Sequence, residues 1–200
     1  MKIPHDHHRE GFTFHKLFQL FKLLHPKNTK ALLRINEFTD LDLKKIQKLT
    51  GNPVKGIILD VDDTIAYNRG KILKKNVEHL NTLLRQGVKI ALYSNMIWTK
   101  RYENLDKRII ILADIEAKPN PNGFKKAIRK LQTKRKNTIM VGDNFVTDAG
   151  TIPMGIPFIK VKPIKTIDKN PIIRILRVPH RAIRWIYDQI ALLHDKFLRN

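Results

Sequence analysis

The chain has 200 residues, 42% of them hydrophobic, and its 39 Lys and Arg against 18 Asp and Glu give a formal net charge of +21 at pH 7. It has no cysteine, which excludes disulfides, thiolate catalysis and zinc bound by Cys, and no apolar run approaches the roughly 18–20 residues of a membrane span. A positive charge of this size attracts phosphate-rich partners, namely nucleic acid, anionic lipid or a phosphorylated substrate.

Residues 1–52 are expected to form an N-terminal extension with a tail and two amphipathic helices. The tail, residues 1–11, holds a histidine cluster that could bind a metal but is more typical of a solvated segment. Residues 12–25 predict a short, very apolar helix with a narrow basic face, which either packs on the domain or lies in a bilayer interface. A targeting presequence is a third interpretation. Residues 40–49 predict a second helix, ended by Gly51.

Residues 53–165 alternate between strand-like and helix-like patterns, which predicts βαβ units and a parallel sheet. The fold class expected is α/β, a three-layer Rossmann-like arrangement with a five-stranded parallel sheet. Helices are expected between the strands over 74–86, 99–105 and 123–131 and from near Thr147. The strands are expected at Val54–Val61, Val88–Tyr93, Ile109–Leu112, Thr138–Val141 and Pro157–Val161.

The first of these strands ends in carboxylates. Asp60 and Asp62 follow a continuous apolar run, and alternation along a strand puts their side chains on the same side. Ligands of open α/β sheets collect beyond the carboxyl ends of the strands. Two close carboxylates repel each other, and a proton on one of them or a hard cation such as Mg²⁺ between them removes the conflict. A turn or helix cap after a core strand is the alternative interpretation.

Polar side chains also follow the second and fourth predicted strands, and one lysine lies in the loop after the third. Each alone could be a turn residue or a solvated lysine. Because parallel strands bring their carboxyl ends to one edge of a sheet, a shared site is favoured. The candidate residues at this edge are Asp60, Asp62, Thr64, Ser94, Asn95, Lys118, Asp143, Asn144 and Asp148.

An ordered set of motifs resembles the haloacid dehalogenase (HAD) superfamily of phosphohydrolases over roughly residues 54–162. The motifs are Asp60-x-Asp62-x-Thr64, Ser94 after a strand, Lys118-Pro119, and Gly142-Asp143-x4-Asp148.

Within the superfamily the chain resembles subfamily III, and in it the mitochondrial-type phosphatidylglycerophosphate phosphatases and their bacterial relatives. The similarity lies in the segments VKGIILDVDDTI, VKIALYSN, AKPNPNGFKKAIRKL and VGDNFVTDAG. The chain departs from that branch at Asp63, where relatives usually carry Asn, and at residues 151–153, where relatives have a Gly-Asn pair.

The resemblance implies a role for each candidate residue. Asp60 would be the nucleophile that forms an aspartyl-phosphate. Asp62 would protonate the leaving oxygen and then take a proton from water, helped by a neighbouring carboxylate that raises its pKa. Lys118 would neutralise the transferring phosphoryl group, and Mg²⁺ would bind Asp60, the backbone carbonyl of Asp62, and Asp143. The other roles are substrate binding or loop support by Thr64, Ser94 and Asn95, and a supporting role for Asn144 and Asp148.

The segments between the motifs leave no room for the cap domain that HAD enzymes often insert there. A predicted helix and strand fill most of the chain between Asp60 and Ser94, and the segment from Ser94 to Lys118 is shorter still. We therefore expect no large cap domain. An open site of this kind admits a large substrate, such as a lipid head group, a protein or a polynucleotide.

Residues 166–200 are expected to form basic amphipathic helices, separated at Pro179. Arginines recur at spacings of three and four, the period of one helix face, and Trp185 lies among several apolar residues. This pattern favours contact with an anionic membrane. Packing on the sheet with a solvated basic face is the alternative, and nucleic-acid binding is a weaker one. The arginines are Arg174, Arg177, Arg181 and Arg184.

Together these features predict a Mg²⁺-dependent phosphomonoester hydrolase that dephosphorylates phosphatidylglycerophosphate to phosphatidylglycerol at a membrane surface. We expect a cytoplasmic protein, peripherally associated with an anionic membrane, since the N-terminus lacks the features of a secretory signal. Two alternatives stay open: the same chemistry on nucleic-acid ends or a phosphoprotein, and a non-catalytic HAD fold used for binding. The intact Asp60, Asp62, Lys118 and Asp143 argue against the last alternative.

Overall fold

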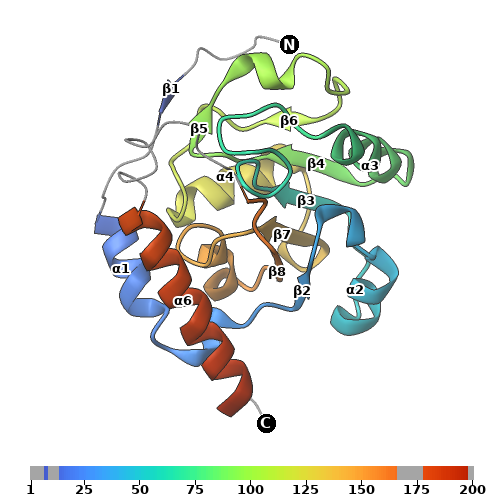
Figure 1. Cartoon of the computed structure of the whole chain (residues 1–200). Helices are drawn as coiled ribbons and strands as arrows, with labels where there is room; N and C mark the ends of the chain where they lie inside the picture. The colour runs from blue at the N-terminus through green and yellow to red at the C-terminus, as the bar shows by residue number, and fades with distance from the viewer. Residues whose placement is uncertain (1–6, 9–13, 166–177, 198–200) are drawn as a thin grey trace.

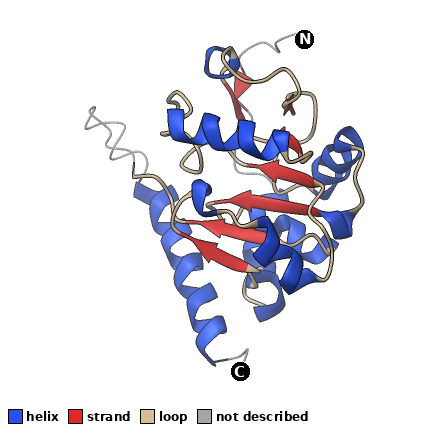
Figure 2. Ribbon diagram, turned by 90° about the vertical axis from the view of Figure 1, so that its right-hand side faces the viewer, coloured by secondary structure: helices blue, strands red, loops and turns tan. Residues whose placement is uncertain are grey.

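The computed structural model of the chain describes residues 7–8, 14–165 and 178–197. Its centre is a six-stranded sheet in the order β2-β8-β7-β3-β4-β6, in which every neighbouring pair is parallel (Figure 1). Figure 2 shows the arrows of the central strands running side by side in one direction. The strands are β2 (Leu33–Ile35), β3 (Gly56–Leu59), β4 (Lys89–Leu92), β6 (Ile110–Ile111), β7 (Thr138–Gly142) and β8 (Phe158–Val161).

Helices pack on both faces of this sheet, which confirms the predicted three-layer Rossmann-like α/β fold. The described residues include five α-helices: α1 (Phe14–Lys22), α2 (Leu43–Thr50), α3 (Lys74–Arg85), α4 (Pro121–Leu131) and α6 (Val178–Phe197). Short 3₁₀ helices join them at η1 (Pro26–Thr29), η2 (Phe38–Asp40), η3 (Thr99–Tyr102), η4 (Arg135–Asn137) and η5 (Asp148–Met154).

The core is divided in two by the sheet, because successive residues of a strand point to opposite faces. Ile57 and Leu59 of β3 pack with the inner faces of α2 and α3. Ile58, between them, packs on the other face with α4 and with Leu23 and Ala191 from the two ends of the chain. The terminal helices α1 and α6 therefore share the layer that contains α4.

The sheet has one strand more than the five expected from the sequence. The additional strand, β2, lies inside the predicted N-terminal extension and pairs with β8 at the edge of the sheet. It has only three residues, and the middle one, Arg34, is exposed, so it lacks the continuous apolar run of a central strand. Phe38 and Ile46 of the same extension are also buried in the core. The extension is thus part of the folded domain from β2 onward.

Two of the predicted helices are short 3₁₀ segments in the structure. The segment expected over 99–105 forms only η3, and the one expected from near Thr147 forms η5. Pro153 lies inside η5 and has no N–H to donate, so a regular α-helix is disfavoured there. Gly150 is also confined, because a Cβ on it would lie 3.0 Å from side-chain atoms of Phe124 and Pro119.

The N-terminal tail is not wholly separate from the domain. His7–His8 form β1, which pairs antiparallel with β5 (Met96–Ile97) in a small two-stranded sheet. The rest of the predicted tail lies outside the described residues.

The C-terminal helix α6 is continuous from Val178 to Phe197, and the expected separation of two helices at Pro179 stays a prediction because the residues before Val178 lie outside the described chain. Pro179 stands in the first turn, where a missing N–H has no helical partner to lose. Arg174 and Arg177, and any helix before α6, lie outside the described residues. None of the described helices is both long enough and apolar enough to cross a membrane.

Polar contacts attach one side of α6 to the core. His194 and Thr29 of η1 form a buried hydrogen bond of 2.8 Å between Nδ1 and Oγ1. Ion pairs join Asp195 to Arg34 of β2 at 2.9 Å and Asp188 to Lys160 of β8 at 3.2 Å. The inner face of the helix therefore packs on the domain, as one of the three sequence interpretations expected.

Candidate active site

The candidate residues meet at the carboxyl ends of three adjacent strands. Asp60 follows β3, Ser94 lies just beyond β4 on one side, and Asp143 follows β7 on the other. The backbone N–H of Asp60 still donates to Val141 of β7 at 2.9 Å, so the sheet itself holds the carboxylate in place. This is the edge at which open α/β sheets bind their ligands.

Asp60 forms a buried chain of charges with one lysine and a second aspartate. Lys118 Nζ donates to Asp60 Oδ1 at 2.5 Å and to Asp148 Oδ1 at 2.6 Å. The side chains of Lys118 and Asp148 are 2% and 0% exposed. Thr64 donates to the other Asp60 oxygen at 3.2 Å. The lysine is thus fixed between two carboxylates.

These contacts set the protonation of the three groups. Burial raises the pKa of Asp60 to about 6, against the opposing charge of Lys118. Burial also raises the pKa of Asp148, again opposed by Lys118. For Lys118, burial acts to lower the pKa, but the two carboxylates outweigh it and raise the pKa. At neutral pH the lysine is charged and Asp60 is mostly an anion, the form in which a carboxylate acts as a nucleophile.

The side chain of one asparagine and the backbone of another hold Lys118 and Asp148 in place. Asn95 bonds both backbone groups of Lys118: its amide donates to the carbonyl at 3.0 Å and its oxygen accepts from the N–H at 2.8 Å. The backbone N–H of Asn144 donates to Asp148 Oδ2 at 3.1 Å. Gly142 is required nearby, because a Cβ there would lie 2.2 Å from Asp148 Oδ2. Asn95 was predicted to bind substrate; in the structure it positions the loop of Lys118.

Three buried carboxylates could hold a metal ion. Asp60, Asp143 and Asp148 each offer one oxygen, and these oxygens lie within 4.8 Å of one another. Burial raises the pKa of Asp143 to about 7, opposed by the charge of Arg184. Hard oxygen ligands of this kind suit Mg²⁺.

The charge balance of the site agrees with such an ion. Its carboxylates are Asp60, Asp62, Asp63, Asp143 and Asp148, and its cations are Lys118, Arg101 and Arg184. With every group ionised, the five carboxylates exceed the three cations by two negative charges. A divalent cation would supply that charge. Of the predicted metal ligands, the structure brings together the carboxylates of Asp60 and Asp143, and it adds the carboxylate of Asp148. Binding of the metal by the backbone carbonyl of Asp62 stays a prediction.

Asp62 is turned toward an arginine that the sequence analysis did not single out. Arg101 of η3 donates to Asp62 Oδ1 at 2.7 Å and to Oδ2 at 3.0 Å. Ser94, predicted to hold a phosphate oxygen, also donates to Oδ2 at 2.9 Å. Burial acts to raise the pKa of Asp62, but the hydrogen bonds and charge of Arg101 outweigh it and lower the pKa. The expected rise of this pKa by a neighbouring carboxylate is therefore wrong for this arrangement.

Little in the sequence indicates that Arg101 belongs to the site. It stands beside Lys100 in a short basic segment, and only the three-dimensional structure separates the two: Lys100 is exposed, whereas the side chain of Arg101 is 0% exposed.

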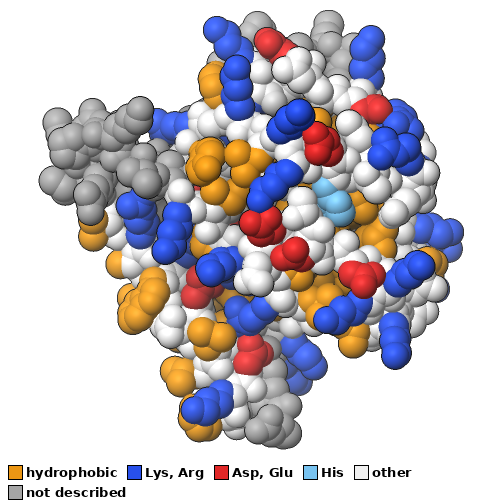
Figure 3. Space-filling view, turned by 45° about the vertical axis from the view of Figure 1, so that its right-hand side comes forward, with side chains coloured by type: hydrophobic (Ala, Val, Ile, Leu, Met, Phe, Trp, Pro, Cys, Tyr) orange, Lys and Arg blue, Asp and Glu red, His pale blue; other side chains and the backbone are white. Residues whose placement is uncertain are grey.

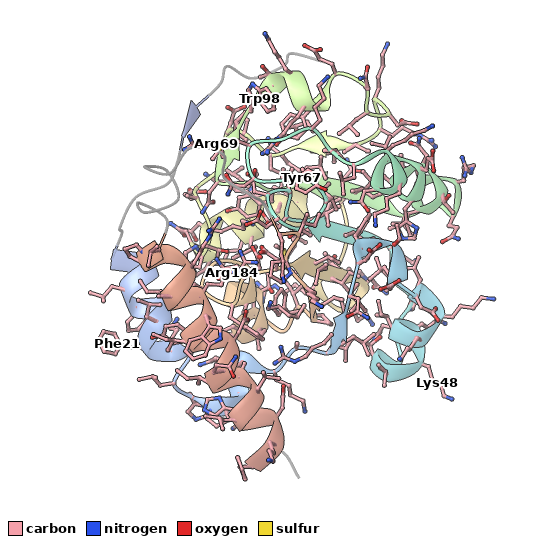
Figure 4. The ribbon with its side chains drawn as sticks, viewed as in Figure 1. Phe21, Lys48, Tyr67, Arg69, Trp98 and Arg184 are labelled. Carbon is pink, nitrogen blue, oxygen red and sulfur yellow. The ribbon has the colours of Figure 1, made fainter. Side chains whose placement is uncertain are left out.

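A second arginine reaches the site from the far end of the chain. Arg184 of α6 forms ion pairs with Asp143 and, at 3.3 Å, with Asp63. Figure 4 shows its side chain directed from α6 toward the centre of the molecule. The sequence pattern predicts that Arg184 belongs to a basic stripe facing a membrane or solvent. The structure corrects this prediction, because the side chain of Arg184 faces the site. Helical spacing identifies residues that share a face but does not say which face turns to the core.

The site has no cap domain over the described chain from Asp60 to Lys118. The first inter-motif segment holds a turn stabilised by short bridges of Ala66 to Asp62 and Ile72, followed by α3 and β4. The second holds β5, η3 and β6. These elements belong to the sheet layers or to a small flap, and none of them forms a cap domain.

Comparisons with known proteins agree with this arrangement. Residues 66–152 match the haloacid dehalogenase-like hydrolase family, a span that contains Ser94, Lys118, Asp143 and Asp148 but begins after Asp60. The parallel sheet and the carboxylates at its edge are those of the HAD-like hydrolase fold, and together with the family match they show that the chain is an enzyme. More particularly, it is similar to the protein named "Probable phosphatase YqeG" of Bacillus subtilis, at 26% identity over 132 residues, which are 61% of this chain and 72% of that protein.

Similar solved structures include proteins without an assigned activity. One is an uncharacterized protein from Listeria monocytogenes serotype 4b, 17% identical, which aligns with 68% of this chain and 99% of its own at a TM-score of 0.47. Another is a hypothetical protein from Xanthomonas campestris, 15% identical, which aligns with 64% of this chain and 72% of its own at a TM-score of 0.43. Similarities of this extent carry no argument about function.

Proposed function

We propose that the chain is a Mg²⁺-dependent phosphatase that hydrolyses phosphate monoesters through an aspartyl-phosphate on Asp60. The observation that carries this proposal is the buried chain Asp60–Lys118–Asp148 at the end of the central strand. It presents an anionic nucleophile beside a fixed cation, and phosphoryl transfer needs little more than such positioning and charge stabilisation. The similarity to a protein named a probable phosphatase supports the same reaction.

In the first half of the reaction, a carboxylate oxygen of Asp60 forms a bond to phosphorus while the bond from phosphorus to the leaving oxygen breaks. Asp62, in its acid form, gives its proton to that oxygen. In the second half, water attacks phosphorus and passes a proton to Asp62, and the bond from phosphorus to Asp60 breaks. Inorganic phosphate is released and Asp60 is restored. Lys118 stays charged throughout and offsets negative charge on the phosphoryl oxygens.

Residues Asp60, Asp143 and Asp148 would hold the divalent cation, which when bound supplies positive charge to the phosphoryl group. Within the chain, Lys118 connects Asp148 with Asp60 and so keeps the nucleophile and the metal-binding carboxylates in one rigid cluster. Removing Mg²⁺ with a chelator should therefore abolish phosphate release while leaving the fold intact.

We further propose that the enzyme acts at an anionic membrane surface. Helices α1 and α6 lie on the same side of the molecule (Figure 1) and both leave large apolar side chains in solvent. Figure 3 shows hydrophobic side chains along the lower left of the molecule, with lysines and arginines spread over the face. The apolar surface is formed by Phe18, Phe21, Leu24, Val178, Ile183, Trp185, Ile186, Leu192, Leu193 and Phe197. We call it the α1–α6 surface.

The geometry of α6 supports a connection between this surface and catalysis. Arg184 points into the site, where its side chain is 13% exposed, whereas the next residue, Trp185, is 63% exposed on the α1–α6 surface. A Trp beside basic residues is typical of helices that lie in a bilayer interface. The residue next to Trp185 thus contacts a metal-binding carboxylate, which suits a substrate embedded in a bilayer that Trp185 contacts.

The substrate we propose is phosphatidylglycerophosphate, converted to phosphatidylglycerol and phosphate. Three features support it: the lack of a cap domain in the described segments between Asp60 and Lys118, the α1–α6 surface, and the resemblance of the sequence segments to phosphatidylglycerophosphate phosphatases. At position 63, where those relatives usually carry Asn, the Asp63 of this chain forms an ion pair with Arg184. The net charge of +21 also favours a polynucleotide substrate, which is the competing proposal.

Phosphate release from three substrates separates these proposals. The measurement uses phosphatidylglycerophosphate in mixed micelles, a soluble aryl phosphate and a 3′-phosphorylated oligonucleotide, each with Mg²⁺. We expect strong preference for the lipid. Activity on the aryl phosphate alone would support a phosphatase but contradict the lipid substrate. Preference for the oligonucleotide would favour the competing proposal. Absence of phosphate release from all three substrates would contradict the proposed phosphatase activity itself.

A further inference from the structure

The guanidinium of Arg101 is completely buried beside the active site. In addition to its two bonds to Asp62, it donates to the backbone carbonyl of Met96 at 2.8 Å and to Ser94 Oγ at 3.2 Å. A buried guanidinium is costly unless it is paired. Its partner here is the carboxylate that the proposed reaction uses as acid and base, rather than a carboxylate elsewhere in the core.

Asp62 in turn is held on both oxygens. Its Oδ1 accepts from Arg101 and from the backbone N–H of Arg69 at 3.0 Å, and its Oδ2 accepts from Arg101 and from Ser94. A bidentate arginine fixes the plane as well as the position of a carboxylate. The carboxylate therefore cannot rotate freely, although it is the side chain of a loop beyond the end of β3.

The donors to Asp62 differ in what they can do. A guanidinium only donates, stays charged and keeps its planar fork. The hydroxyl of Ser94 can either donate or accept, so it can leave Asp62 Oδ2 and bond a phosphoryl oxygen instead. With Ser94 turned away, Arg101 still holds Asp62 through Oδ1. The fork is the part of the arrangement that persists when a substrate occupies the site.

We propose that Arg101 is a positioning residue for Asp62, holding its carboxyl group where the leaving oxygen of the substrate receives its proton. This inference rests on the proposed phosphatase reaction and adds to it a residue that acts through Asp62. Arg101 neither gives nor takes a proton. Its contributions are orientation, which decides how much of the effect of a general acid is realised, and a charge that favours the carboxylate left once Asp62 has given its proton.

The inference makes a prediction about leaving groups. A nitrophenolate leaves as a stable anion and needs little protonation, whereas an alkoxide such as that of glycerol needs a proton from Asp62. Loss of Arg101 should therefore damage hydrolysis of alkyl phosphates far more than hydrolysis of nitrophenyl phosphates. A role confined to holding η3 in place would lower both rates alike.

The test compares kcat and KM of full-length Arg101→Gln, Arg101→Lys and Asp62→Asn on glycerol phosphate and on 2,4-dinitrophenyl phosphate. Lys100→Gln, an exposed neighbour in η3, is the matched control. We expect Arg101→Gln to lose about 100-fold in kcat on the alkyl ester, the range of general acid catalysis, and only a few-fold on the nitrophenyl ester. Its KM should be nearly unchanged, and Asp62→Asn should show the same contrast.

Two further measurements distinguish positioning from packing. The double variant Arg101→Gln with Asp62→Asn should lose no more alkyl-ester activity than Asp62→Asn alone, because residues acting as a unit are not additive. Guanidinium ion added to Arg101→Ala at non-denaturing concentration should restore part of the alkyl-ester activity.

The outcomes that overturn the inference are separate from those that overturn the proposed function. Equal losses on both esters, an increase confined to KM, or additive losses in the double variant would each remove the positioning role while the unmodified enzyme remained active. Absence of turnover by the unmodified enzyme on every ester would instead overturn the proposed function, and the role of Arg101 with it.

Discussion

At the scale of single residues, the site is governed by a shortage of positive charge. Asp60, Asp143 and Asp148 are buried close together, and burying an anion without a full partner favours its protonated form. The pKa values of Asp60 and Asp143 are accordingly raised to about 6 and about 7. The same residues that would bind a metal ion therefore destabilise the fold when they ionise without one.

This gives a prediction for stability against pH. In the unfolded chain aspartates titrate near pH 4, whereas Asp60 and Asp143 titrate near 6 and 7 in the fold. Over that interval the folded state binds more protons than the unfolded state, so the free energy of unfolding should fall as pH rises. We expect a decrease of at least about 2 kcal/mol between roughly pH 4.5 and pH 8 in a chelating buffer, measured by urea unfolding.

Added Mg²⁺ should reduce this loss, since a bound cation stabilises the ionised carboxylates. Asp143→Asn, which removes one of the carboxyl groups whose pKa is raised, should flatten the dependence of stability on pH in chelating buffer. A stability that is constant or rises over this interval without metal would show that these carboxylates ionise at their ordinary pH.

At the scale of elements, α6 has two faces with different tasks. One face brings Arg184, Asp188 and His194 to the core, and the other exposes Trp185 and Ile186. The apolar and basic pattern of this helix was visible in the sequence, but the assignment of Arg184 to the outer face was wrong. Arg184 pairs with Asp63, 121 residues away, and with Asp143 after β7, and helix periodicity carries no information about such distant partners.

Replacing Arg184 should loosen α6 from the site. Arg184→Met leaves Asp63 and Asp143 facing each other without their cation, and breaking a largely buried ion pair costs about 3 kcal/mol. The free energy of unfolding, measured with urea at neutral pH without metal, should fall by about that amount. Arg129→Met, exposed on α4, should change it by less than about 0.5 kcal/mol. Equal effects of the two substitutions would contradict the inward role of Arg184.

Polar substitutions on the α1–α6 surface should weaken membrane binding. Phe21 and Trp185 are 63% exposed each, and burying such side chains in an interface contributes about 1.5–3 kcal/mol apiece. Phe21→Ser with Trp185→Ser should therefore lower affinity for anionic vesicles at least about tenfold in a sedimentation assay, with turnover of a soluble aryl phosphate unchanged. The control is Leu49→Ser, which replaces an apolar side chain of similar exposure on α2. Unchanged vesicle affinity in the double variant would remove the membrane proposal.

At the scale of the whole molecule, the sequence contained most of the fold because its central strands are continuous apolar runs. Ile57, Ile58 and Leu59 are each 0% exposed, and such a run ending in Asp60 predicts both a central parallel strand and a site at its end. Strand β2 could not be predicted in the same way, since a three-residue edge strand has neither the length nor the periodicity to differ from a loop.

The candidate site was predictable as a set of strand-end residues but not as a set of contacts. Lys118 and Asp148 could be expected near Asp60 because of their order along the chain. The pairing of Asp62 with Arg101, and hence the lowered pKa of Asp62, depends on how η3 folds back over the loop after β3. That geometry arises from packing between segments 39 residues apart, which no local sequence pattern encodes.

The central claim is that Asp60 is the nucleophile of a phosphatase, and phosphate release by Asp60→Asn tests it most directly. The substitution keeps the size of the side chain and replaces the attacking oxygen by an amide, so hydrolysis of a soluble aryl phosphate with Mg²⁺ should fall by at least about 10³-fold. Unfolding measured in parallel should show that the variant remains folded. Retention of normal phosphatase activity by a folded Asp60→Asn would contradict the account.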